Sequence, residues 1–355
     1  MKIHVYILRQ LLVAFLFAVG ALLFIAFPGI AVSTVHKMPN VDAALLLRFL
    51  PLVLQSLAPY VLPLCFMLST VAVFGRLAAD KEWIAIHMAG IHPLKTLFTP
   101  FLVATGLGIF TFWMVSNELP QLKKRQKDFV VNATGSYVEN LQPGKSSIRF
   151  GGFSLLAAFR DEGGTFHDVY VRLPGESRDY FASSASLALD PSGQFLDVAL
   201  TDFQIFTSAT GEFAQDGSSV SRVDLTRWAD QEQRRYDRPK YLVSEEIRER
   251  LERGDFDEKK TREAKFMLHY RMTMFAIYFL FLVLGAATGL LMRRGTQLGA
   301  LAVAAGYGIL YYVLSMRLGK ELGRSSSLPP WVGAWLTTIV GGGVGAYLLR
   351  RAMRR

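Results

Sequence analysis

A short segment rich in charged and aromatic residues, Arg76 to Pro93, has the residue types of a protein contact site. Its pattern predicts a helix over about 80–91, with Asp80 as the N-cap and Glu82 in the first turn, where the helix dipole favours an acid. Apolar residues would cover part of this helix, namely Trp83, Ile84, Ile86 and Met88. Two interpretations stay open: a coupling helix that fits a groove on a cytoplasmic motor, with Glu82 making a polar contact, or a helix lying on lipid headgroups.

Basic residues form three further clusters, and their members are His36 and Lys37, then Lys123, Lys124, Arg125 and Lys127, then Arg317, Lys320 and Arg324. If these clusters share one membrane depth, they could bind an anionic lipid headgroup through charge-assisted hydrogen bonds. The alternative is ordinary snorkelling of long basic side chains at helix ends.

The sequence lacks the residue sets of common catalytic and metal sites. Gly144-Lys145-Ser146 ends like a phosphate-binding loop, but Glu139 stands where that loop needs glycine. The six histidines form no metal-ligand spacing, and the single cysteine, Cys65, excludes an intrachain disulfide. The acids of the apolar regions all fall at expected helix ends, which disfavours an ion-driven carrier. If the protein transports a substrate, the energy would therefore come from a partner.

The formal net charge of +10 would suggest nucleic-acid binding in a soluble protein. Its distribution argues against this, because residues 121–265 carry a net charge of −2 and the remainder +12. The positive charge thus flanks the apolar stretches of a chain that is 51% hydrophobic, a pattern typical of membrane proteins. We expect a membrane protein with no nucleic-acid partner.

Six stretches free of Asp, Glu, Lys, Arg and His each reach the roughly 20 residues needed to cross a bilayer. They cover residues 10–35, 49–75, 96–117, 272–292, 295–316 and 325–349. The expected fold class is an α-helical membrane protein of six transmembrane helices, three before and three after an inserted all-β domain. We expect the boundaries to fall at 1–120, 121–268 and 269–355.

Lys and Arg are unevenly distributed over the short loops. With the N-terminus inside, the inner segments hold eleven of them and the outer short loops five. The positive-inside rule therefore places both termini in the cytoplasm and the insert outside. The three basic clusters then lie on the outer face, against the usual bias, which slightly favours the lipid-binding interpretation.

The insert has the pattern of strands over its first two thirds. Apolar residues alternate in Val169–Leu173 and in Leu196–Leu200, with Gly and Pro turn signals between them. This pattern suggests an antiparallel sandwich or an open jelly roll. A short charged helix is expected over 244–253, with Ser244 as its N-cap and Gly254 after its end.

In three motifs the chain resembles the lipopolysaccharide-export permease family, the F and G subunits of the Lpt transporter. The first is Arg76-Leu followed by Lys81-Glu82 and Met88-Ala-Gly-Ile91. The others are Ser327-Leu-Pro-Pro-Trp-Val-Gly-Ala-Trp335 and His269-Tyr-Arg271. The resemblance extends over the whole chain and includes the plan of three helices, a periplasmic β-jellyroll and three helices.

The resemblance implies an inner-membrane half-transporter of a Gram-negative bacterium that pairs with a homologous permease. Two cytoplasmic ABC ATPase subunits would hold ATP and Mg, and this chain would bind no cofactor directly. Lipopolysaccharide would enter between the first and fifth helices and pass through the β-jellyroll to a single-helix bridge protein with its own periplasmic β-jellyroll. The ATPase-coupling residues would be Glu82, Trp83, Ile86 and Arg76. The lipopolysaccharide-binding residues would be Lys37, His36, Lys124, Lys127, Arg317 and Lys320.

Two other functions remain possible on sequence grounds. One is a membrane-anchored envelope scaffold whose outer domain binds partners, although six helices and a coupling helix exceed what an anchor needs. The other is an enzyme of lipid-linked sugars, for which the sequence has no paired acids or metal cluster at a helix end.

Overall fold

The computed structural model describes residues 2–37, 43–126, 144–150, 153–161, 163–172, 178–189, 195–207, 212–224, 238–292, 296–324 and 328–354. The chain divides into two compact units, Met1–Gln126 with Arg238–Arg355, and Lys127–Asp237. The inserted domain is therefore shorter at both ends than the expected 121–268, because its flanking residues pack with the helices.

Within its described residues, the helical unit contains six helices long and apolar enough to cross a membrane, as expected. Their membrane spans are Lys2–Ile30, Leu47–Ala79, Pro93–Gln126, Glu258–Leu291, Gln297–Gly323 and Pro330–Met353. The corresponding elements are α1 (Lys2–Lys37), α2 (Ala43–Ala79), α4 (Pro93–Trp113) with the π-helix η1 (Met114–Glu118), α8 (Glu258–Leu291), α9 (Gln297–Leu314) with the π-helix η3 (Ser315–Gly319) and α10 (Lys320–Arg324), and α11 (Pro330–Met353). Shorter elements are α3 (Glu82–Met88), η2 (Pro239–Tyr241) and α7 (Ser244–Arg253).

Helix α8 forms the centre of this unit and packs against α2, α4 and α11. Small residues allow the close approach to α2: a Cβ on Gly289 would lie 2.7 Å from the backbone nitrogen of Gly75. A hydroxyl pair joins α8 to α4, because the Tyr278 hydroxyl lies 2.7 Å from Thr111 Oγ1. In α8, 72% of the most apolar stretch is buried within the chain, against 6% in α1. Helix α1 thus packs against α2 and α4 on one side and leaves its other side open to lipid or to another protein.

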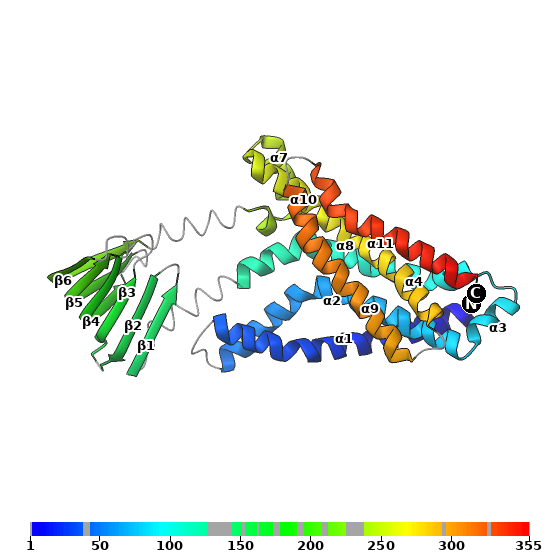
Figure 1. Ribbon diagram of the computed structural model, residues 1–355, viewed down its shortest axis with the longest axis horizontal. Coiled ribbons are helices and arrows are strands. Elements are labelled where there is room, and N and C mark those ends of the chain that lie inside the picture. The colour runs from blue at the N-terminus through cyan, green and yellow to red at the C-terminus, as the bar shows by residue number, and fades with distance from the viewer. Residues whose placement is uncertain are drawn as a thin grey trace. The chain divides into compact units, whose positions relative to one another are not determined.

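The inserted unit contains one six-stranded antiparallel sheet whose strands follow in sequence order. The strands are β1 (Gly144–Phe150), β2 (Phe153–Arg160), β3 (Phe166–Arg172), β4 (Arg178–Leu189), β5 (Phe195–Thr207) and β6 (Glu212–Asp224) (Figure 1). Cross-strand neighbours Val169, Ala182 and Phe203 are all buried, so one face of the sheet carries a continuous apolar core. The expected all-β insert is confirmed; a two-layer sandwich is not formed by the strands that the structure describes.

Candidate functional site

The segment between α2 and α4 forms the expected short helix, α3, but it is shorter than 80–91. Helix α3 begins at Glu82 because Lys81 has a left-handed backbone conformation (φ 59°), which ends the helical path of α2 and changes the direction of the chain. Asp80 does not cap α3, contrary to expectation: its backbone N–H bonds the Arg76 carbonyl, and its carboxylate lies 3.5 Å from Arg76 Nε. Gly90 (φ 79°) ends the segment as expected.

Trp83 anchors α3 to the rest of the helical unit. Its indole is only 7% exposed and meets the Phe74 ring of α2 edge to face at a centroid distance of 5.9 Å. The His87 ring stacks edge-on at 4.3 Å, and its Nε2 is buried without a hydrogen-bond partner in the described chain. Burial, and then the nearby His92, lower the pKa of His87, which keeps the imidazole neutral near pH 7.

The apolar residues of α3 divide between two faces. Trp83 and the partly buried Ile86 pack against the helical core, whereas Ile84 and Met88 point outward with 47% and 84% of their surfaces exposed. A partner that docks on α3 would thus touch Ile84 and Met88. Trp83 was expected to be one of the residues that contact the ATPase. Because its side chain is buried against this chain, it is not available for a direct contact with a partner.

Glu82 is held by a residue that the sequence did not indicate. The Tyr6 hydroxyl of α1 lies 3.0 Å from Oε1 and 2.9 Å from Oε2 of Glu82. Helix α1 is tied down a second time nearby, because His4 Nδ1 lies 2.8 Å from Thr99 Oγ1 of α4. Tyr6 and Glu82 are 76 positions apart, so no local spacing could have revealed the pair.

The predicted lipid-binding residues are only partly described. His36 and Lys37 fall in the last turn of α1, but their side chains lie outside the described part of the structure, as does Lys127 altogether. Lys124 follows η1 and is partly buried, whereas Arg317 in η3 and Lys320 at the start of α10 are exposed. Arg317 and Lys320 are therefore available to a ligand, and a common site with Lys124 remains a prediction.

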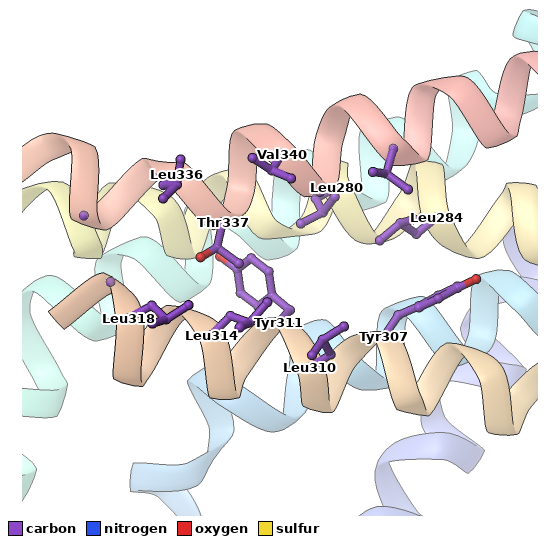
Figure 2. A pocket seen from close by; sticks show the side chains of 14 residues that line it. Leu280, Leu284, Tyr307, Leu310, Tyr311, Leu314, Leu318, Leu336, Thr337 and Val340 are labelled. Atoms are coloured by element: carbon purple, nitrogen blue, oxygen red, sulfur yellow. The ribbon is translucent and has the colours of Figure 1, made fainter. Parts of the chain in front are cut away.

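An apolar groove lies between α9, η3 and α11, with α8 as its floor, and its lining includes Leu318 and Gly319, which stand between these two cations in the chain. Its volume is about 370 Å³, and Figure 2 shows Leu310, Leu314 and Leu318 on one side and Leu336 and Val340 on the other. At one end the backbones of η3 and α11 touch, because a Cβ on Gly319 would lie 2.7 Å from the carbonyl oxygen of Gly333. Such a groove can hold a hydrocarbon chain.

Arg271 of α8, within the third matched motif, connects three segments of the helical unit. It is 2% exposed, and its Nη1 donates to Ser244 Oγ at 2.7 Å and to the Ser116 carbonyl at 3.4 Å. Its Nη2 donates to the carbonyls of Leu242 at 2.6 Å and Pro239 at 3.5 Å. This explains why Ser244 is not the N-cap of α7, which is Val243: the serine hydroxyl is held by Arg271. Arg271 thus fixes the chain where it returns from the insert.

No group of three or more His, Cys, Asp or Glu side chains in the described residues could hold a metal ion. Gly144-Lys145-Ser146 begins strand β1 and not the loop before a helix that phosphate binding needs.

Comparison with known proteins agrees with this architecture. The model of the family described as lipopolysaccharide export system permease LptF/LptG matches residues 5–351. The comparison with curated proteins gave no match. Because the family match covers nearly the whole chain, including all six apolar helices and the β insert, the chain belongs to the LptF/LptG family of lipopolysaccharide export permeases.

Proposed function

We propose that this permease is one half of an ATP-driven transporter that extracts lipopolysaccharide from the inner membrane and passes it through the β domain to a periplasmic bridge protein. The observation that carries the proposal, beyond the family, is the link from α3 to α1 through Glu82 and Tyr6. A short helix at the membrane surface that is bonded to a largely uncovered transmembrane helix can pass a movement of a docked ATPase to that helix.

The proposed topology places both termini and α3 in the cytoplasm and the β domain in the periplasm. The excess of Lys and Arg in the corresponding loops supports it. In Figure 1 the N-terminus, the C-terminus and α3 lie at the same end of the helical unit, as this topology requires.

The proposed partners are a homologous permease, two cytoplasmic ABC ATPase subunits and a single-helix bridge protein. Only 6% of the most apolar stretch is buried in α1, and 28% in each of the spans containing α9 and α11. These surfaces would be covered by lipid and by the homologous permease. The outward side chains of Ile84 and Met88 would pack into a groove on the surface of an ATPase subunit. The ATPase subunits would hold ATP and Mg.

Lipopolysaccharide would enter between the first and fifth membrane helices, α1 and α9. Its phosphates would meet the basic residues at the periplasmic helix ends, Lys37, His36, Lys124, Lys127, Arg317 and Lys320. The apolar groove between α9 and α11 includes Leu318 and Gly319, the chain neighbours of Arg317 and Lys320, and it suits one acyl chain. Charge reversal in Lys320→Glu should therefore reduce crosslinking to lipopolysaccharide, and Lys37→Glu should do the same.

The decisive experiment purifies the chain with its genomic neighbours and measures ATP hydrolysis and lipopolysaccharide extraction, with and without Glu82→Ala. Glu245→Ala is the matched control, since Glu245 is an exposed acid in the first turn of another helix. The proposal predicts that an ATPase co-purifies and that only Glu82→Ala lowers extraction. If no ATPase co-purifies, or if the two variants behave alike, the membrane-anchored scaffold becomes the better explanation.

A further inference from the structure

A second cavity opens between α1, α2 and the first turn of α9, at the α3 end of the helical unit. Its volume is about 620 Å³. Tyr6, Arg9 and Gln10 of α1, Arg76 of α2 and Gln297 of α9 line it together with apolar residues. Arg317 lies 20 positions beyond Gln297 along the same span, which corresponds to about 30 Å of helix. The cavity is therefore distant from the cations assigned above to lipopolysaccharide.

The α1 side of this cavity changes from polar to apolar along one helix face. Its members recur at intervals of three and four residues and are Tyr6, Arg9, Gln10, Val13, Ala14 and Phe17. Ala72 and Val73 of α2 continue the apolar part, and Arg76 one turn later joins the polar part. The cavity is thus cationic at the α3 end and hydrocarbon-like toward the middle of the membrane.

The charges at the polar end are not neutralised by the cavity itself. No acidic side chain is among the described residues that line it. Arg9 is exposed and forms no ion pair with a described carboxylate, and Arg76 stays 61% exposed despite its contact with Asp80. The nearby Glu82 carboxylate is hydrogen-bonded to Tyr6 and does not line the cavity. Two guanidinium groups therefore line an open space whose described lining contains no acid, although Asp80, outside the cavity, pairs with Arg76.

The apolar end is open sideways. Val13 and Phe17 are 63% and 79% exposed, and both lie within the membrane span of α1. In the chain by itself, a membrane lipid can therefore reach the cavity directly from the bilayer. A water-soluble anion would leave the apolar half of the cavity empty. The shape and charge together select an amphiphile with an anionic head.

We propose that this cavity binds an anionic phospholipid, with its phosphate between Arg9 and Arg76 and an acyl chain along Val13, Ala14, Phe17, Ala72 and Val73. Guanidinium groups bind phosphate through paired charge-assisted hydrogen bonds. The polar end of the cavity should therefore prefer a lipid with an anionic phosphate headgroup. In the topology proposed above, this lipid belongs to the cytoplasmic leaflet. It would lie beside the Tyr6–Glu82 link and could bias the position of α3.

Native mass spectrometry of the full chain in detergent tests this site, with dioleoyl phosphatidylglycerol as the probe and dioleoyl phosphatidylcholine as the comparison lipid. We expect one phosphatidylglycerol to bind more tightly than phosphatidylcholine. Arg9→Gln should raise the Kd for this lipid about tenfold, which corresponds to the loss of one charge-assisted interaction. Arg9→Lys keeps the positive charge but loses the planar set of N–H donors of the guanidinium group. It should therefore raise the Kd by less than Arg9→Gln does. Arg351→Gln is the matched control, because Arg351 is an exposed arginine of α11 that does not line the cavity.

Inorganic phosphate distinguishes a lipid site from a simple anion site. Millimolar phosphate should leave the bound phosphatidylglycerol in place, because it gains nothing from the apolar half of the cavity. Displacement by phosphate, equal effects of Arg9→Gln and Arg351→Gln, or equal affinity for the two lipids would each overturn the proposal. The measurement needs neither ATPase nor lipopolysaccharide, so its failure would leave the proposed transport function untouched.

Discussion

The Tyr6 hydroxyl lies within 3.0 Å of both carboxylate oxygens of Glu82, and this pair joins the first turns of the first transmembrane helix to the short helix α3. Both helices also pack against α2, α3 mainly through Trp83 and α1 along its side. The Tyr6–Glu82 pair adds a direct polar link between α3, whose Ile84 and Met88 are exposed, and a transmembrane helix of which little is fully buried within this chain.

Tyr6→Phe should weaken this connection without removing the aromatic ring. The pair is largely exposed, so the lost hydrogen bond is worth about 1 kcal/mol or less. We expect lipopolysaccharide extraction per ATP hydrolysed to fall by up to about fivefold while ATP hydrolysis itself continues. Tyr347→Phe, at an exposed tyrosine of α11, is the control. An unchanged ratio in Tyr6→Phe would show that the pair has no part in coupling.

Trp83→Ala should detach α3 from α2. Truncating a buried tryptophan costs about 3 kcal/mol or more, and here the loss falls on one short segment. Hydrogen exchange of residues 82–90 should therefore accelerate, and the ATPase should no longer co-purify. Met88→Ala, at a side chain that is 84% exposed, should leave exchange unchanged and weaken only the partner contact. If both variants exchange alike, Trp83 is not the anchor.

Arg271→Met should loosen the chain where it returns from the β domain. It leaves the Leu242 and Ser116 carbonyls and the Ser244 hydroxyl without their donor, at about 1–3 kcal/mol for each buried group. Exchange should rise in residues 238–253, and Arg271→Lys should recover part of the protection. Arg248→Met, at an exposed position of α7, serves as the control. Equal protection in Arg271→Met and the control would contradict the assigned role.

A single ion pair should make the β unit sensitive to acid. Arg172 of β3 donates to both carboxylate oxygens of Asp179 of β4, at 2.6 and 2.8 Å, and thereby lowers the pKa of Asp179. A depressed carboxyl pKa adds stability above the unfolded value of roughly 4, and that stability is lost as the pH falls through the folded value.

A comparison of wild type with Asp179→Asn tests whether the charge on Asp179 stabilises the β unit at neutral pH and not at acid pH. At pH 7 the variant should be less protected from hydrogen exchange in β3 and β4, after correction for intrinsic rates. The difference should shrink as the pH is lowered below roughly 4 and vanish below the depressed pKa of folded Asp179, where the wild-type carboxyl is neutral in both states. A difference that stays constant over that pH range would mean that the charge on Asp179 is not what stabilises these strands.

Much of the architecture follows from local sequence patterns. The six apolar stretches predicted the six membrane helices, and the alternation in Val169–Leu173 predicted a strand, in which Val169 and Val171 are indeed buried. These features depend on residues close together in the chain, and hydrophobic periodicity is therefore sufficient to find them. Gly254 also ended α7 as expected, with φ 75°.

The remainder depends on tertiary contacts that no spacing encodes. Ser244 and Asp80 both have the residue type of an N-cap, but a distant arginine holds the first and Arg76 competes for the second. Tyr6 and Arg9 looked like ordinary residues at the start of a membrane helix until the fold placed them beside Glu82 and Arg76. Trp83 was correctly assigned to α3 but expected on its outer surface, because a seven-residue helix is too short for its buried face to be read from periodicity.

The central proposal is that this chain converts ATP hydrolysis by a partner into movement of lipopolysaccharide out of the membrane. The most direct measurement is the release of lipopolysaccharide from proteoliposomes that contain the purified complex, in the presence and absence of ATP. We predict ATP-dependent release with the wild-type chain and a large loss of release with Glu82→Ala, with the complex still assembled. ATP hydrolysis without any release, or equal release with Glu82→Ala, would contradict the proposal.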